Sequence, residues 1–101
     1  MNDDNTATPP PMTIDAFQKH IFDRYEATDR VRGTPLTWMW FIEEVGELSH
    51  ALARGQDRAN IEEEFADVFA WLCTLANIND VDLAEAVRNK YMSGQQPEGT
   101  K

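Results

Sequence analysis

Two groups of acidic residues, each inside an apolar segment of helical periodicity, constrain most strongly how this chain can fold. They read Glu43-Glu44-x-x-Glu47 and Glu62-Glu63-Glu64-x-x-Asp67. Residues three positions apart lie on the same face of an α-helix, so Glu44 points the same way as Glu47. The same holds for Glu64 and Asp67. The sequence therefore predicts two helices that each carry a pair of carboxylates on one face.

The segment between the two groups predicts a tight turn. Gly55 is a natural C-terminal stop for the first of these helices, and Asp57 or Asn60 can cap the second. At a rise of about 1.5 Å per residue, both acidic pairs lie roughly 7–12 Å from the turn. If the two helices pack antiparallel, the pairs face each other at similar height.

Four carboxylates that converge in this way repel one another, and a hard cation is the usual means of holding them together. Oxygen ligands suit Mg²⁺ or Mn²⁺. We therefore expect a metal site formed by four residues: Glu44, Glu47, Glu64 and Asp67. The alternative is that the acidic runs are solvated helix faces, because glutamate is a good helix former. For Glu62 and Glu63 the solvated or capping face is the expectation.

The pattern Glu-Glu-x-x-Glu followed by Glu-x-x-Asp resembles the metal-binding signature of the MazG-like, all-α nucleotide pyrophosphohydrolases. The surrounding stretches FIEEVGELSHAL and EEFADVFAWL resemble that family's second and third helices, and the resemblance extends from Thr13 to Tyr91. It implies an all-α, four-helix bundle. It also implies a Mg²⁺-dependent enzyme that hydrolyses a nucleoside triphosphate to a monophosphate and pyrophosphate, with a housecleaning role in the nucleotide pool.

Further site residues follow from the resemblance and from position. Asn89 and Lys90 fall where the family carries an Asn/Lys pair, which implies phosphate contacts, although the basic residue that many relatives place just downstream is absent. Glu43 is a candidate proton acceptor by adjacency to the metal ligands. Trp40 and Trp71 each lie one turn from an acidic pair, so either can stack on a base or pack in the core or a subunit interface.

Two other functions compete with hydrolysis. Glu47 and His50 form a Glu-x-x-His motif, the ligand pair of di-metal oxidases in helical bundles, but the partner motif here is Glu-x-x-Asp. A non-catalytic helical interaction module that retains the fold is the second alternative. The complete acidic set argues against such a module, because binding a partner through helices requires no buried carboxylates.

The composition narrows the class of protein. A chain of 101 residues suits one domain, and a net charge of −9 argues against binding to a nucleic acid polymer. Cys73 is the single cysteine, which excludes an intramolecular disulfide, and we expect it to be buried. With no apolar run near 18 residues and no signal-peptide pattern, we expect a cytoplasmic protein without a membrane segment.

The remaining segments complete the predicted helical domain, residues 13–93. We expect a disordered N-terminal tail at 1–12 and a C-terminal tail at 94–101. Thr13 caps a helix that runs to about Ala27, and residues 28–35 form a connector. Arg30 and Arg32 in that connector either reach a phosphate or solvate a loop. Asn79 or Asp80 caps the fourth helix.

Apolar stripes on the two central helices predict the core and an assembly. The expected core residues are Trp38, Phe41, Ile42, Val45, Leu48 and Leu52 on the first helix, and Ile61, Phe65, Val68, Leu72 and Leu75 on the second. Trp40, Trp71 and Met39 remain on other faces. Because such an apolar surface usually marks an interface, we expect a homodimer or homotetramer whose second subunit closes the nucleotide site.

Overall fold

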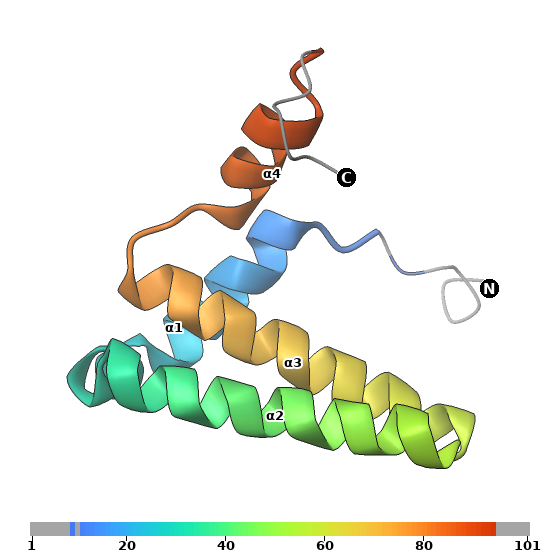
Figure 1. Cartoon of the computed structure of the whole chain (residues 1–101). Helices are drawn as coiled ribbons and strands as arrows, with labels where there is room; N and C mark the ends of the chain where they lie inside the picture. Colours follow the sequence, from blue (N-terminus) through green and yellow to red (C-terminus); the bar gives the residue numbers. More distant parts are fainter. Residues whose placement is uncertain (1–8, 10, 95–101) are drawn as a thin grey trace, which may run out of the picture.

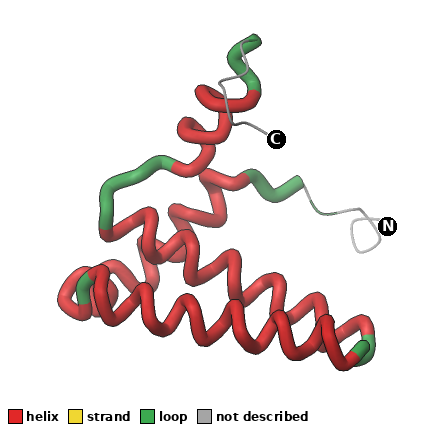
Figure 2. Tube along the Cα trace, viewed as in Figure 1, coloured by secondary structure: helices red, strands yellow, loops and turns green. Residues whose placement is uncertain are grey.

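Four α-helices make up the computed structural model, which describes residues 9 and 11–94. They are α1 (Ile14–Arg32), α2 (Thr34–Arg54), α3 (Arg58–Ile78) and α4 (Leu83–Tyr91). The described part contains no strand (Figure 2), so the all-α, four-helix prediction is confirmed. The tails expected at 1–12 and 94–101 lie largely outside the described residues. None of the helices in the described part is both long and apolar enough to cross a membrane.

Helices α2 and α3 lie side by side and run in opposite directions (Figure 1). The turn between them follows the predicted chemistry. Gly55 adopts the left-handed conformation with φ 63°, and the Asp57 side chain accepts a hydrogen bond of 2.9 Å from the backbone N–H of Asn60. Both ends are therefore satisfied locally, and the chain reverses within a few residues.

The predicted connector at residues 28–35 is wrong, because α1 continues to Arg32 and only Gly33 separates it from α2. Gly33 has φ 82°, which a residue with a side chain rarely adopts. Polar contacts of Asp29 and Arg32, the latter in the last turn of α1, accompany this extension of the helix. Buried Asp29 accepts hydrogen bonds from Arg32 at 2.6 Å and from Thr74 on α3 at 3.2 Å. Arg30 and Arg32 therefore lie on a helix and not in a loop.

A buried amide pair joins α1 to the segment that leads into α4. The Nε2 of Gln18 donates to Asn77 Oδ1 at 2.9 Å and to the Val81 carbonyl at 2.7 Å, and its Oε1 accepts from the Leu83 N–H at 2.9 Å. The cap predicted at Asn79 or Asp80 is wrong, since Asp82 caps α4 by accepting from the Glu85 N–H at 3.0 Å. Asn79 and Asp80 instead form a turn after α3, with Asp80 at φ 57°.

The buried apolar residues gather mainly in the C-terminal half of α3, where α1 packs against it. They are Ile21, Ala51, Cys73, Leu75 and Ala76. Cys73 is buried as expected, and burial raises the pKa of its thiol to about 11.

Much of the predicted core is exposed. Five of the expected core residues have at least 38% of their surface accessible: Trp38, Ile42, Leu52, Phe65 and Leu72. The physical reason is that neighbouring helices cover only part of these apolar stripes. Within one copy, α2 and α3 pack on each other and on α1, so their apolar stripes are wider than the surface that these neighbours cover. Gly46 shows the same openness, because a methyl group added to it would meet no atom within 4 Å.

Replacement of Gln18 by Ala tests the buried amide pair. We expect the free energy of unfolding to fall by about 2–3 kcal/mol, because the Val81 carbonyl and the Leu83 N–H lose their partner in a part-buried position. Urea denaturation measures this change. Lys19→Ala is the matched control, since the side chain of Lys19 is 74% exposed, and it should change stability by less than about 0.5 kcal/mol. Equal stabilities of the two variants would contradict the structural role of Gln18.

Candidate functional site

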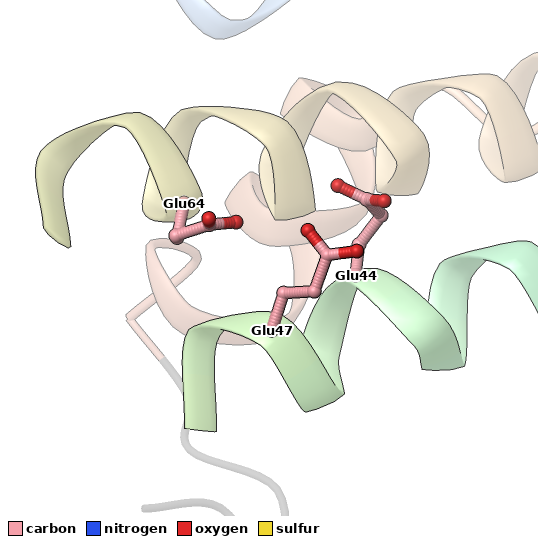
Figure 3. Close-up of side chains that lie close together, drawn as sticks. All are labelled: Glu44, Glu47 and Glu64. Carbon is pink, nitrogen blue, oxygen red and sulfur yellow. The ribbon is translucent and has the colours of Figure 1, made fainter. Parts of the chain in front are cut away.

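Three glutamates from two helices meet between α2 and α3. Glu44 and Glu47 extend from α2 and Glu64 extends from α3, all toward the space between the two helices (Figure 3). One carboxylate oxygen of each residue lies within 4.8 Å of one oxygen of each of the others. The antiparallel pairing that the turn at Gly55 imposes is thus what brings the two acidic groups together.

Burial leaves one carboxylate oxygen of this site without a hydrogen-bond partner. Glu44 and Glu64 are half-buried, whereas Glu47 is exposed. Glu64 Oε1 is buried and has no hydrogen-bond partner among the described residues. A buried carboxylate oxygen without a partner is costly, and a cation relieves that cost. The donor set consists of oxygens only, which fits Mg²⁺ or Mn²⁺.

Like charges dominate the electrostatics of the site. Burial raises the pKa of Glu44 above its ordinary value of 4.5, and the carboxylates of Glu47, Asp67, Glu64 and Glu43 raise it further. The pKa of Glu64 is also raised, first by burial and then by Glu47, Asp67 and Glu63. Every charged group that acts on these two glutamates is itself a carboxylate. The arrangement therefore favours an added positive charge.

Asp67 lies at the edge of this group and also belongs to a cleft. It is exposed, and the set of mutually close oxygens consists of Glu44, Glu47 and Glu64 without it. It nevertheless acts on the charge of both Glu44 and Glu64. Asp67 lines a cleft of about 400 Å³ between α1 and α3, together with Trp71 and Arg32. Asp67 is therefore the residue that relates the acidic group to this cleft.

Trp40 and Trp71 contact each other beside this cleft. Their ring centroids are 5.7 Å apart in an edge-to-face arrangement. The Arg32 guanidinium lies 4.8 Å from the Trp40 ring and 5.2 Å from the Trp71 ring, and its Nε donates to Thr37 Oγ1 at 2.9 Å. Arg32 is thus a cation–π partner that holds the two indoles in place. The sequence reasoning missed this role, although the spacing of Asp29 and Arg32 on one helix face was a usable signal.

The residues expected to contact phosphate lie elsewhere in the same copy. Asn89 and Lys90 are on α4, which packs against α1 and stands apart from the α2–α3 pair (Figure 1). The Lys90 Nζ lies 5.5 Å from the ring of its neighbour Tyr91. One copy of the chain therefore does not bring these two residues to the three glutamates.

The di-metal oxidase alternative requires His50 beside Glu47 in the acidic group. Within the described residues, the group of side chains able to hold a metal ion consists of glutamates alone. His50 is exposed and is not a member of that group. The geometry thus favours a hard cation with oxygen ligands over a histidine-bound iron pair.

A comparison with known protein families matches the segment of the chain that carries the acidic site. A family model described as the MazG nucleotide pyrophosphohydrolase domain matches residues 34–93, which is more than half of the chain. A comparison with curated proteins gives no match. The matched segment runs from the start of α2 past the end of α4 and contains all the acidic residues of the site.

The electrostatics of the site predict how stability depends on pH. The pKa values of Glu44 and Glu64 are raised in the folded protein, so protonation of these two residues favours the folded state. Their contribution to the free energy of unfolding is therefore fully present below the ordinary pKa of 4.5. It is lost as the pH rises through the raised values. With a chelator present, urea denaturation should therefore show stability falling over this range.

Glu47→Gln supplies the comparison, because Glu47 is the first of the carboxylates that raise both pKa values. The variant should lose less stability over the same pH range and be more stable than the wild type at neutral pH. Parallel pH profiles for the two proteins would contradict the inferred repulsion.

Proposed function

The chain belongs to the MazG nucleotide pyrophosphohydrolase domain family, and on that premise we propose that it hydrolyses NTPs or dNTPs. The products are the nucleoside monophosphate and pyrophosphate, and Mg²⁺ or Mn²⁺ is required. The observation that supports this most directly is the convergence of oxygens from Glu44, Glu47 and Glu64 within 4.8 Å. Removal of unwanted nucleotides from the cellular pool is the physiological role that we propose with it.

The proposed chemistry assigns each acidic residue a task. Glu44, Glu47 and Glu64 would hold Mg²⁺ between α2 and α3, and Asp67, which lines the neighbouring cleft, would add a ligand. The metal, when bound, supplies neutralisation of phosphate charge and a lowered pKa of water. Glu43, which is exposed beside Glu44, accepts the proton of the attacking water. Attack at the α-phosphorus then releases pyrophosphate.

The cleft between α1 and α3 suits the nucleoside. Asp67 belongs to both the cleft and the acidic site, so a nucleotide with its phosphates at the glutamates can extend its base toward Trp71. Trp40 supports Trp71 from its edge, and Arg32 restrains both rings. We therefore assign Trp71 the contact with the base, and Trp40 the task of positioning Trp71.

We further propose a homodimer or homotetramer. The exposed apolar residues of α2 and α3 include Met39, at 62% of its surface, and Phe65, at 54%. Trp38, Ile42 and Leu72 on the same two helices are also exposed, and a methyl group added to Gly46 would meet no atom within 4 Å. Because large apolar side chains gathered on a helix pair usually mark an interaction surface, we propose a second copy as the cover.

Hydrolysis gives the direct test. The wild type should release pyrophosphate from members of an NTP and dNTP panel only when Mg²⁺ or Mn²⁺ is added. Glu47→Gln and Asp67→Asn should each lower kcat/KM by roughly 100-fold or more, because each removes a proposed metal ligand. Each variant should also lose the increase in Tm that Mg²⁺ produces. Arg58→Gln is the control, since Arg58 pairs with Glu62 on the exposed face of α3. Full activity in either acidic variant would remove that residue from the ligand set.

Concentration dependence tests the assembly. If dissociation exposes the apolar surface of α2 and α3, Tm should rise with protein concentration. Met39→Glu should shift the equilibrium toward the monomer, because a charge at a buried interface is costly. Light scattering measures the mass directly. A mass near 11.5 kDa at micromolar concentration, with full activity, would refute a shared site.

A further inference from the structure

We propose that Arg32 determines which base the cleft between α1 and α3 accepts, by selecting bases with a carbonyl oxygen at the edge remote from the sugar. Uracil, thymine, guanine and hypoxanthine carry this oxygen, whereas cytosine and adenine carry an amino group in its place. The inference rests on the proposed hydrolysis and deepens it, because it names the class of base that the same site takes.

Arg32 is a nearly buried cation with hydrogen-bond donors that the protein does not use. Its side chain is 10% exposed, its Nε donates to Thr37 Oγ1 at 2.9 Å, and its Nη2 donates to Asp29 Oδ1 at 2.6 Å. A guanidinium group carries five N–H donors and no acceptor. Within the described residues, the hydrogen bonds of Arg32 leave both N–H groups of Nη1 unused. Because Arg32 lines the cleft, these donors are available to a bound ligand.

The carboxylate beside Arg32 is already engaged. Asp29 is buried, and its two oxygens accept from Arg32 and from the Thr74 hydroxyl, the latter at 3.2 Å. Tyr25 and Thr28 also line the cleft, but a hydroxyl group can donate or accept and so does not distinguish a carbonyl from an amino group. The fixed polar group that faces a ligand at this end of the cleft is therefore a donor.

The order of residues along α3 orients a nucleotide in the cleft. Asp67, Trp71 and Thr74 line it from one face of the helix, at spacings of four and three residues. Asp67 lies at the end near the acidic group, whereas Thr74 lies about 10 Å farther along the helix and bonds to Asp29. With its phosphates at the glutamates, a nucleotide therefore directs the edge of its base that is remote from the sugar toward Arg32.

Arg32 is close enough to Trp71 to contact a base that packs on this ring. The centre of the guanidinium lies 5.2 Å from the Trp71 ring centroid, and both side chains line the cleft. Asp29, Thr37 and the Trp40 ring already hold the guanidinium in place, so little ordering remains when a base binds. A carbonyl oxygen accepts from these donors. An amino group in the same place sets donor against donor and leaves both unpaired.

Two pairs of nucleotides that differ at this edge test the selection: dUTP against dCTP, and dITP against dATP. The sugar and triphosphate are identical within each pair, so the metal and phosphate contacts cancel in the comparison. In the presence of Mg²⁺, kcat/KM should be roughly tenfold to 100-fold higher for the carbonyl member of each pair. Equal values within the pairs, or a preference for the amino members, would overturn the proposal.

A double variant, Asp29→Asn with Arg32→Gln, tests whether Arg32 causes the preference. The glutamine amide offers an acceptor beside its donor, so the ratio within each pair should fall toward one. Replacing Asp29 as well avoids a buried carboxylate without a partner, and the asparagine oxygen can still accept from Thr74. A full carbonyl preference in the folded double variant would show that Arg32 is not its source.

Two single variants complete the comparison. Arg32→Lys keeps a cation beside Asp29 and a group that only donates, so it should retain the direction of the preference even where the double variant folds poorly. Arg30→Gln is the matched control, because Arg30 belongs to the same last turn of α1 but bonds to Asp80 and does not line the cleft. Its ratios should equal those of the wild type. Loss of the preference in Arg30→Gln, or its reversal in Arg32→Lys, would contradict the assignment.

Binding of the monophosphates gives a readout that does not depend on hydrolysis. Calorimetric titration with dUMP, dCMP, dIMP and dAMP, each with Mg²⁺, should give a lower Kd for the carbonyl member of each pair in the wild type and not in the double variant. A wild type that hydrolyses no triphosphate but shows this order would refute the hydrolysis and support the selection. Hydrolysis at equal rates, with equal Kd values, would refute the selection and leave the hydrolysis standing.

Discussion

The repulsion among Glu44, Glu47 and Glu64 is the interaction on which the rest of this structure depends. Their oxygens lie within 4.8 Å of one another, and the pKa values of Glu44 and Glu64 are raised by burial and by neighbouring carboxylates. Two helices hold these side chains together because the turn at Gly55 and the Asp57 cap fix the register of the pair. The fold thus stabilises an arrangement that its own charges oppose, as is typical of a site prepared for a ligand.

A second charged group in the same small protein shows the contrasting case. Asp29 is more buried than any residue of the acidic site, and its two oxygens accept hydrogen bonds from Arg32 and from Thr74. Arg32 in turn donates to Thr37 and lies over two indole rings. Because this network is satisfied, it serves structure and positions the cleft. The structural carboxylate is buried with partners for both of its oxygens, whereas Glu64 has a buried oxygen without a partner among the described residues.

Local signals in the sequence accounted for the parts of the fold that depend on local chemistry. Glycine at the left-handed turn, Asp57 as a cap and carboxylates three residues apart were sufficient to predict the α2–α3 pair and the meeting of Glu44, Glu47 and Glu64. The length of α1 was not predictable in that way, since the contact between Asp29 and Thr74 joins residues 45 positions apart.

Contacts distant in the sequence also explain the other differences. The bond between Gln18 and Leu83 moves the start of α4 beyond Asn79 and Asp80. The apolar stripes of α2 and α3 were recognisable, but periodicity does not show whether a stripe is covered by the same chain or by another. Trp38 and Phe65 belong to these stripes and are exposed in the described chain. Sequence patterns therefore predicted which glutamates lie close together more fully than they predicted which apolar residues are buried.

The uneven distribution of the buried residues has a mechanical consequence. On α3 they form one continuous stretch, Cys73–Asn77, next to α1, whereas the half of the helix that carries Glu64 has none. Glu64 therefore lies where α3 has no buried side chain of its own to resist a small displacement. Like charges push the two helices apart at that point, and a cation between them would draw them together.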